Sequence, residues 1–148
     1  MMNRSGLLKS LLLLLTMIIM PTLVSGGGNP SLNGGDILGS WEILKAVTPK
    51  QQILPLEGQV YQIRFMADGR IHMKFENNVI NGKYETEGAN LRLPQPLMMT
   101  MAAWQPDSPA PRFLTLMENA TNYFFKDELL YVDTLADGGT LQLRKVAE

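Results

Sequence analysis

Apolar and polar residues alternate most regularly in two short stretches, residues 60–65 and residues 70–75, which are separated by Ala67-Asp68-Gly69. The apolar members are Tyr61, Ile63, Phe65, Ile71, Met73 and Phe75. A period of two is typical of a strand with one buried and one solvated face. The pattern therefore predicts a β-hairpin whose turn contains Gly69.

Short apolar stretches separated by turn residues continue along the rest of the chain. They predict strands at residues 41–47, 79–85, 91–93, 97–103, 123–126, 129–135 and 140–146. One helix is predicted at residues 112–120, capped by Asp107 or Ser108, with Phe113, Leu116, Met117 and Ala120 on its apolar face. Many strands and one helix predict a small β-rich α+β domain, with a curled antiparallel sheet or partial barrel.

The first residues have the three parts of a secretory signal peptide. Arg4 and Lys9 precede the apolar residues 11–20, and small residues lead to Gly26, where we place the cleavage site. We expect a signal peptide at residues 1–26, a Gly-rich spacer at residues 27–35 and one domain at residues 36–148. An uncleaved leader that acts as an anchor is the alternative. Either reading predicts a periplasmic or cell-envelope protein.

The chain contains no cysteine, which excludes disulfides and a lipid-modified cysteine after the leader. Without Arg4 and Lys9 it has 11 basic and 14 acidic residues. We therefore predict that it is not a lipoprotein and does not bind nucleic acid, because nucleic-acid binders carry a clustered basic excess. The oligomeric state is left open.

Several motifs occur in a characteristic order. Residues 78–84 read N-x-x-x-G-x-Y, with Asn78, Gly82 and Tyr84, and are followed by Thr100, Met101, Ala102 and Ala103. Further matches are Leu38, Gly39, Trp41, Phe113, Leu114, Tyr123, Leu129 and residues 141–143. In this order the chain resembles the META domain of heat-inducible, HslJ-like bacterial envelope proteins. The resemblance implies a compact β-rich domain with one helix, and it implies no particular reaction.

The resemblance also assigns structural roles. We expect Asn78, Gly82, Tyr84, Thr100, Met101 and Ala102 to be structural, with Asn78 bonded to its own turn and Gly82 meeting a backbone constraint. The family's G-C-N block aligns with Glu76, Asn77 and Asn78, and its T-x-M-A-C block ends at Ala103. Both positions where many members carry Cys are therefore occupied by other residues, which hints that Asn77 and Ala103 lie close together.

The polar face of the predicted hairpin carries a basic stripe. Its members are Arg64, Arg70, His72 and Lys74. On an acidic protein such a stripe fits an anionic lipid surface or an acidic envelope protein. A solvated strand face that guards against aggregation is the plain alternative.

Other chemistry is poorly supported. His72 is the only histidine, and the acidic pairs Glu85/Glu87 and Asp127/Glu128 lie at strand ends or turns, so we predict no enzyme and no cofactor. The first hypothesis is a non-enzymatic binding or assembly-support protein of the envelope. The alternative is a small-ligand or copper carrier. Its barrel interior would be lined by Met99, Met101, Trp41 and Trp104.

Overall fold

The computed structural model describes residues 36–147. The predicted signal peptide and spacer lie outside the described residues. In the part of the chain that the structure describes, no helix is long and apolar enough to cross a membrane.

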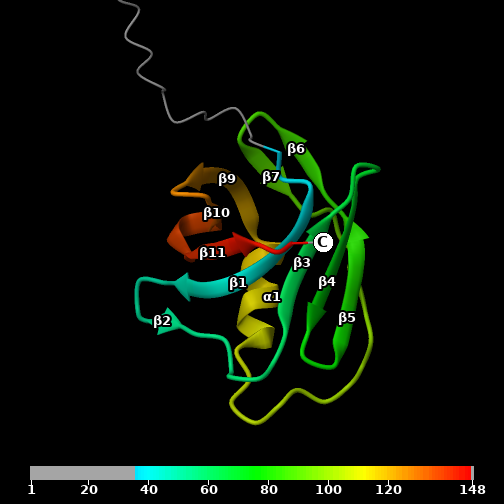
Figure 1. Ribbon diagram of the computed structural model, residues 1–148, viewed down its shortest axis with the longest axis vertical. Coiled ribbons are helices and arrows are strands. Elements are labelled where there is room, and N and C mark those ends of the chain that lie inside the picture. The colour runs from blue at the N-terminus through cyan, green and yellow to red at the C-terminus, as the bar shows by residue number, and fades with distance from the viewer. Residues whose placement is uncertain (1–35, 148) are drawn as a thin grey trace, which may run out of the picture.

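The described residues form an antiparallel sheet and one α-helix (Figure 1). The strands are β1 (Gly39–Val47), β2 (Gln52–Ile53), β3 (Tyr61–Phe65), β4 (Arg70–Phe75), β5 (Asn78–Lys83), β6 (Glu85–Glu87), β7 (Asn90–Arg92), β8 (Met98–Met99), β9 (Ala120–Lys126), β10 (Leu129–Thr134) and β11 (Thr140–Lys145). The helix is α1 (Ala110–Glu118), and a short 3-10 turn, η1 (Leu135–Asp137), connects β10 to β11.

The sheet is curled, and a single residue connects β5, next to one end of the sheet, to β6 at the other end. The strand order is β6-β7-β9-β10-β11-β1-β3-β4-β5-β8, with β2 paired to β1. The chain leaves β5 and enters β6 through Tyr84 alone, so Tyr84 forms a corner between the two ends. Its backbone N–H donates to Gly69 O (2.9 Å) and its hydroxyl donates to Met66 O (2.7 Å). The curled antiparallel sheet with one helix is as predicted.

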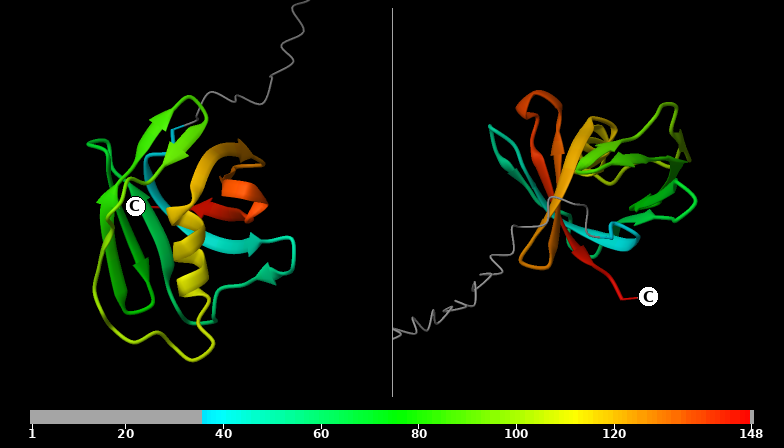
Figure 2. Two further views of the ribbon diagram at one scale, coloured as in Figure 1. Left: turned by 180° about the vertical axis from the view of Figure 1, so that it is seen from behind. Right: turned by 90° about the horizontal axis from the view of Figure 1, so that it is seen from above.

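Helix α1 covers the concave side of this sheet, as the view from behind shows (Figure 2). Phe113, Leu116 and Met117 are buried, at the i, i+3 and i+4 spacing of one helix face. The Phe113 ring packs edge-on against Tyr61, with centroids 5.4 Å apart. Burying each such side chain contributes about 1.5–3 kcal/mol. The concave side is therefore filled by side chains.

The central hairpin is confirmed. Strands β3 and β4 pair Ile63 with Met73, and every second residue of each strand is buried. Gly69 in the turn has a φ of 83°, a conformation that a residue without Cβ adopts easily.

The helix begins and ends earlier than predicted. It starts at Ala110 because Pro109 and Pro111 hold φ near the helical value at the first positions. Ser108 does take part, since its Oγ accepts a hydrogen bond from the Ala110 N–H (3.0 Å). Ala120 leaves the helix because it pairs with Thr134 in the sheet.

The predicted strand at residues 97–103 is mostly wrong. Only Met98–Met99 forms a strand, pairing with Asn81 and Ile80 of β5. The residues that follow run alongside the end of the sheet without forming a ladder, because the buried side chain of Asn78 holds them there.

Candidate functional site

The predicted basic stripe lies on the outer face of the central strands. The register pairs Arg64 with His72 and places Lys74 opposite Gln62. Arg64, Arg70 and Lys74 are exposed, and His72 is half-buried. Lys83 of β5 pairs with Arg70 and extends the stripe by one strand. We call Arg64, Arg70, His72, Lys74 and Lys83 the basic face. Sequence reasoning missed Lys83 because only the register with β4 brings it beside Arg70.

Two contacts order side chains on the basic face. Arg70 Nε donates to Asp68 Oδ2 (2.6 Å), an exposed ion pair in the hairpin turn. The backbone N–H of Arg70, followed by its side chain, lowers the pKa of the Asp68 carboxyl. His72 Nδ1 lies 2.8 Å from Asn81 Oδ1 and donates to it, because an amide oxygen only accepts. This contact ties the His72 ring to β5.

Exposed methionines border the basic face. Met98 lies opposite Asn81 in the register and is 75% exposed, and Met101 is 89% exposed. The predicted carrier interior lined by Met99 and Met101 is therefore wrong. Met101 points into solvent, and Met99 is itself 37% exposed on the two-residue strand β8.

The two tryptophans of the carrier hypothesis pack on the hydrophobic core. Trp41 is buried and fills space: its indole N–H donates to Ile37 O (2.8 Å), and the Lys145 ammonium lies over its ring. Trp104 packs at the margin of the core. His72 and Met73 do not share a site, because Met73 is fully buried and lies on the opposite face of β4. Within residues 36–147, no three His, Cys, Asp or Glu side chains cluster as metal ligands.

Asn78 joins two of the motif segments. Its buried side chain accepts hydrogen bonds from the Ala102 N–H (2.9 Å) and Thr100 Oγ1 (3.1 Å), and its Nδ2 donates to Ala102 O (2.9 Å). The Val79 N–H donates in turn to Thr100 Oγ1 (3.0 Å). The expectation that Asn78 bonds its own turn is therefore wrong, since its partners lie more than 20 residues away. Buried amides need such partners.

Glu76 makes a second polar link, which sequence reasoning missed. Its buried carboxylate accepts from Tyr61 Oη (2.7 Å), the Gln105 N–H (2.9 Å) and Ser108 Oγ. Burial raises the pKa of Glu76, but these three donors outweigh it and lower the pKa below its ordinary value. Burial and the neighbouring Glu76 raise the pKa of Tyr61. The carboxylate is thus a charged anchor for the chain before α1.

Glu76 departs from the G-C-N motif of the resembled family. Its φ is 54°, in the left-handed region that favours glycine, and the resemblance places a family glycine at this position. The contacts of Glu76 with Gln105 and of Asn78 with Ala102 lie on either side of Asn77 and Ala103. The two positions that carry Cys in many members are therefore on neighbouring segments here.

Gly82 is constrained by a side chain rather than by its backbone angle. A Cβ built on Gly82 would lie 2.3 Å from Leu97 Cδ2. Leu97 packs on the core just before β8, so the absence of a Cβ lets this connection approach β5. The expected backbone constraint is replaced by a packing constraint.

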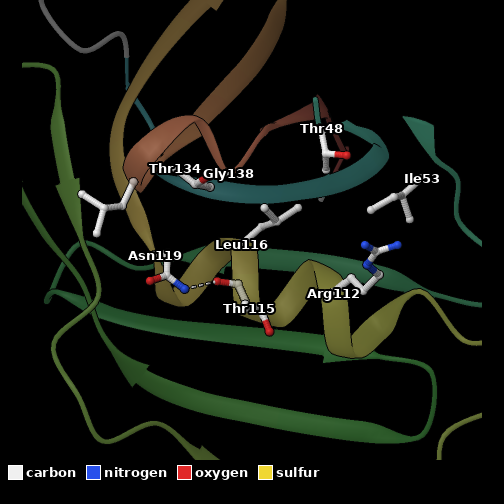
Figure 3. A pocket seen from close by; sticks show the side chains of 9 residues that line it. Thr48, Ile53, Arg112, Thr115, Leu116, Asn119, Thr134 and Gly138 are labelled. Carbon is white, nitrogen blue, oxygen red and sulfur yellow. Dashed lines mark hydrogen bonds between the residues drawn. The ribbon is translucent and has the colours of Figure 1, made fainter. Parts of the chain in front are cut away.

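A groove lies between α1, the β1–β2 connection and η1 (Figure 3). Its volume is about 350 Å³. We call it the α1 groove, and its lining residues are Thr48, Ile53, Arg112, Thr115, Leu116, Asn119, Thr134, Leu135 and Gly138. No sequence signal could have found it, because its walls come from three separate parts of the chain.

The comparisons with known proteins show a fold and a family. No curated protein matches the chain. Among solved structures, the fold is similar to a DUF4847 family protein from Bacteroides vulgatus, with TM-score 0.55 and 14% identity over 74% of this chain and 94% of that one. It is also similar to a protein from Burkholderia xenovorans, with TM-score 0.61 and 15% identity over 74% of this chain and 83% of that one. The META domain profile matches residues 37–148. The chain therefore belongs to the META domain family.

Proposed function

We propose that this protein is an exported, non-enzymatic binding protein of the bacterial cell envelope, and that its basic face contacts an anionic lipid surface. The observation that carries the proposal is the register of β3, β4 and β5, which gathers four Arg and Lys side chains and His72 on one outer face. Each basic residue near an anionic membrane surface contributes about 1 kcal/mol.

The exposed methionines favour lipid over an acidic protein partner. Met98 lies beside the basic face, opposite Asn81, and Met101 follows two residues after β8; both have unbranched apolar side chains that are mostly in solvent. Cationic groups beside apolar groups suit the boundary between headgroups and acyl chains. A purely electrostatic partner would have no use for these two side chains.

Export is supported by the N-terminal pattern, in which Arg4 and Lys9 precede the apolar residues 11–20 and a small-residue exit. The absence of catalysis is supported by the surroundings of the groups that could carry it. His72 lies on the outer face, away from Ser108 and Glu76, and the Glu76 carboxylate is occupied by three donors. One of these donors is Ser108, so this hydroxyl does meet a carboxylate, but the carboxylate is buried and also binds Tyr61 and the Gln105 N–H.

The proposal is tested with vesicles of phosphatidylglycerol and of phosphatidylcholine, using the protein recovered from the envelope fraction. We expect binding to the anionic vesicles alone, and a loss of binding in high salt because screening weakens exposed charges. The triple variant Arg64→Ala, Arg70→Ala and Lys74→Ala should bind at least about tenfold more weakly, since each lost charge removes about 1 kcal/mol. Its melting temperature should fall by only a few degrees.

The matched control removes three exposed basic residues elsewhere, Lys50→Ala, Lys126→Ala and Arg144→Ala. It should bind as the unchanged protein does. Equal binding of both triple variants would reject the basic face as the contact surface. Binding to neutral vesicles as strongly as to anionic ones would reject the electrostatic contact itself. Recovery of an acidic protein on the basic face, without vesicle binding, would replace the lipid by a protein partner.

A further inference from the structure

The α1 groove has the shape of a site for an elongated molecule. Its floor follows α1 from Arg112 through Leu116 to Asn119, the spacing of one helix face over two turns. Seven residues of helix rise about 10 Å. Figure 3 shows Arg112 beside Ile53 at one end of the groove and Asn119, Thr134 and Gly138 at the other. The volume lies at the small end of the range for ligand sites, about 300–1,000 Å³.

One end of the groove is cationic. Arg112 is exposed, and within residues 36–147 its guanidinium makes no hydrogen bond or ion pair. None of the lining residues is acidic. A guanidinium offers two parallel N–H donors that match a carboxylate. The charge at this end therefore selects an anionic group.

The groove is apolar in its middle, and its far end places the apolar Leu135 beside the polar Asn119 and Thr134. Leu116 forms the floor, and Leu135 is 63% exposed on η1. The Leu135 N–H donates to Asn119 O (2.9 Å), which ties η1 to the end of α1. Ala136 follows with a φ of 54°. Such backbone conformations are unfavourable for residues other than glycine and persist where the surrounding structure imposes them, as at ligand sites.

We propose that the α1 groove binds a medium-chain fatty carboxylate, with its carboxylate on Arg112 and its alkyl chain along Leu116 toward Leu135. Each part of this ligand matches one part of the groove. The carboxylate meets Arg112, the one unpaired cation among the lining residues, and the alkyl chain has the length of the apolar wall. This site lies on different elements from the basic face, and it does not depend on the proposed contact with a membrane.

The test is a titration of the isotope-labelled protein from the envelope fraction, followed by amide NMR, with octanoate as the probe. Acetate carries the same charge without the chain, and octylamine carries the chain with the opposite charge. We expect octanoate to shift the amides of Thr115, Leu116 and Asn119 with saturation, and expect neither other compound to do so. Absence of saturable shifts with octanoate, or equal shifts with octylamine, would overturn the proposal.

Variants locate the two ends of the ligand. Arg112→Gln removes the cation from an exposed position, so the fold should be retained and octanoate should bind at least tenfold more weakly. Leu135→Ser should weaken octanoate binding, because it removes the apolar contact for the end of the alkyl chain. The controls are Arg144→Gln and Met101→Ser, which change exposed residues outside the groove. Unchanged octanoate binding by Arg112→Gln would show that the carboxylate does not lie on this arginine. The proposed ligand site would then be rejected.

Discussion

Strands β3 and β4 bury an apolar side chain at every second position, whereas the connection at residues 94–109 exposes most of its side chains. The hairpin is held by apolar burial along its whole length. The connection is held by two buried polar side chains, Glu76 in the turn after β4 and Asn78 at the start of β5. An irregular segment can thus be placed by a few satisfied polar groups, provided that the supporting strand is rigid.

Asn78→Ala should have the largest effect on the connection at residues 94–109. It removes three hydrogen bonds and leaves the Ala102 N–H and C=O without their partners. We expect the free energy of unfolding to fall by about 3 kcal/mol. The melting temperature should fall by about 10–15 °C. Thermal unfolding followed by circular dichroism measures this.

The neighbouring variant Asn77→Ala is the control, because Asn77 is exposed. It should change stability by less than about 0.5 kcal/mol. If the two variants were equally stable, the side-chain contacts of Asn78 would not be what holds residues 100–102.

Glu76→Gln should have a smaller effect, and one that depends on pH. The folded-state pKa of Glu76 is lowered from its ordinary value of 4.5, so its stabilisation is present above that value and is lost as the pH falls below it. We expect the variant to be about 1–2 kcal/mol less stable at neutral pH, because an amide nitrogen cannot accept from these donors. The difference should shrink as the pH falls to about 3.

Urea unfolding at several pH values measures the effect of Glu76→Gln. Glu87→Gln changes an exposed carboxylate in β6 and serves as the control, with little difference at any pH. A stability difference for Glu76→Gln that stays constant from neutral to acid pH would contradict a charged Glu76 in the folded protein.

Gly82→Ala should have the smallest effect of the three and tests where the connection meets the sheet. The new methyl group must displace Leu97 Cδ2, the end of a flexible side chain, so we expect a loss of about 1 kcal/mol. Combined with Leu97→Ala, the cost should be at least about 0.5 kcal/mol less than the sum of the two single changes. Simple additivity in this double-mutant cycle would show that Gly82 is required for another reason.

Much of the regular part of the molecule could be predicted from sequence. The alternation through Tyr61, Ile63 and Phe65 reports a strand because the period of side-chain burial is a property of the strand itself. The same holds for the spacing of Phe113, Leu116 and Met117 on α1. The four predicted members of the basic face could also be found from the local pattern, since a two-strand hairpin fixes which residues face outward.

The remainder depends on contacts that no local pattern encodes. Met99 and Met101 lie in an apolar stretch of the kind that forms a buried strand. They are exposed because β8 pairs with β5 at only two positions. The partners of Asn78 lie in a segment that had been predicted as a strand. Arg112, Leu135 and Ile53 meet only after the sheet has curled, so the α1 groove is a property of the tertiary structure.

The ends of the curled sheet bear on how copies of this chain behave at high concentration. A sheet invites another chain to add to it wherever a long strand leaves its backbone groups unpaired. Here the two ends of the sheet are β6, with three residues and two glutamates, and β8, with two residues that follow Pro94 and Pro96. Neither offers a ladder long enough for strand addition. The described domain is thus protected against edge-to-edge aggregation without the help of a disulfide.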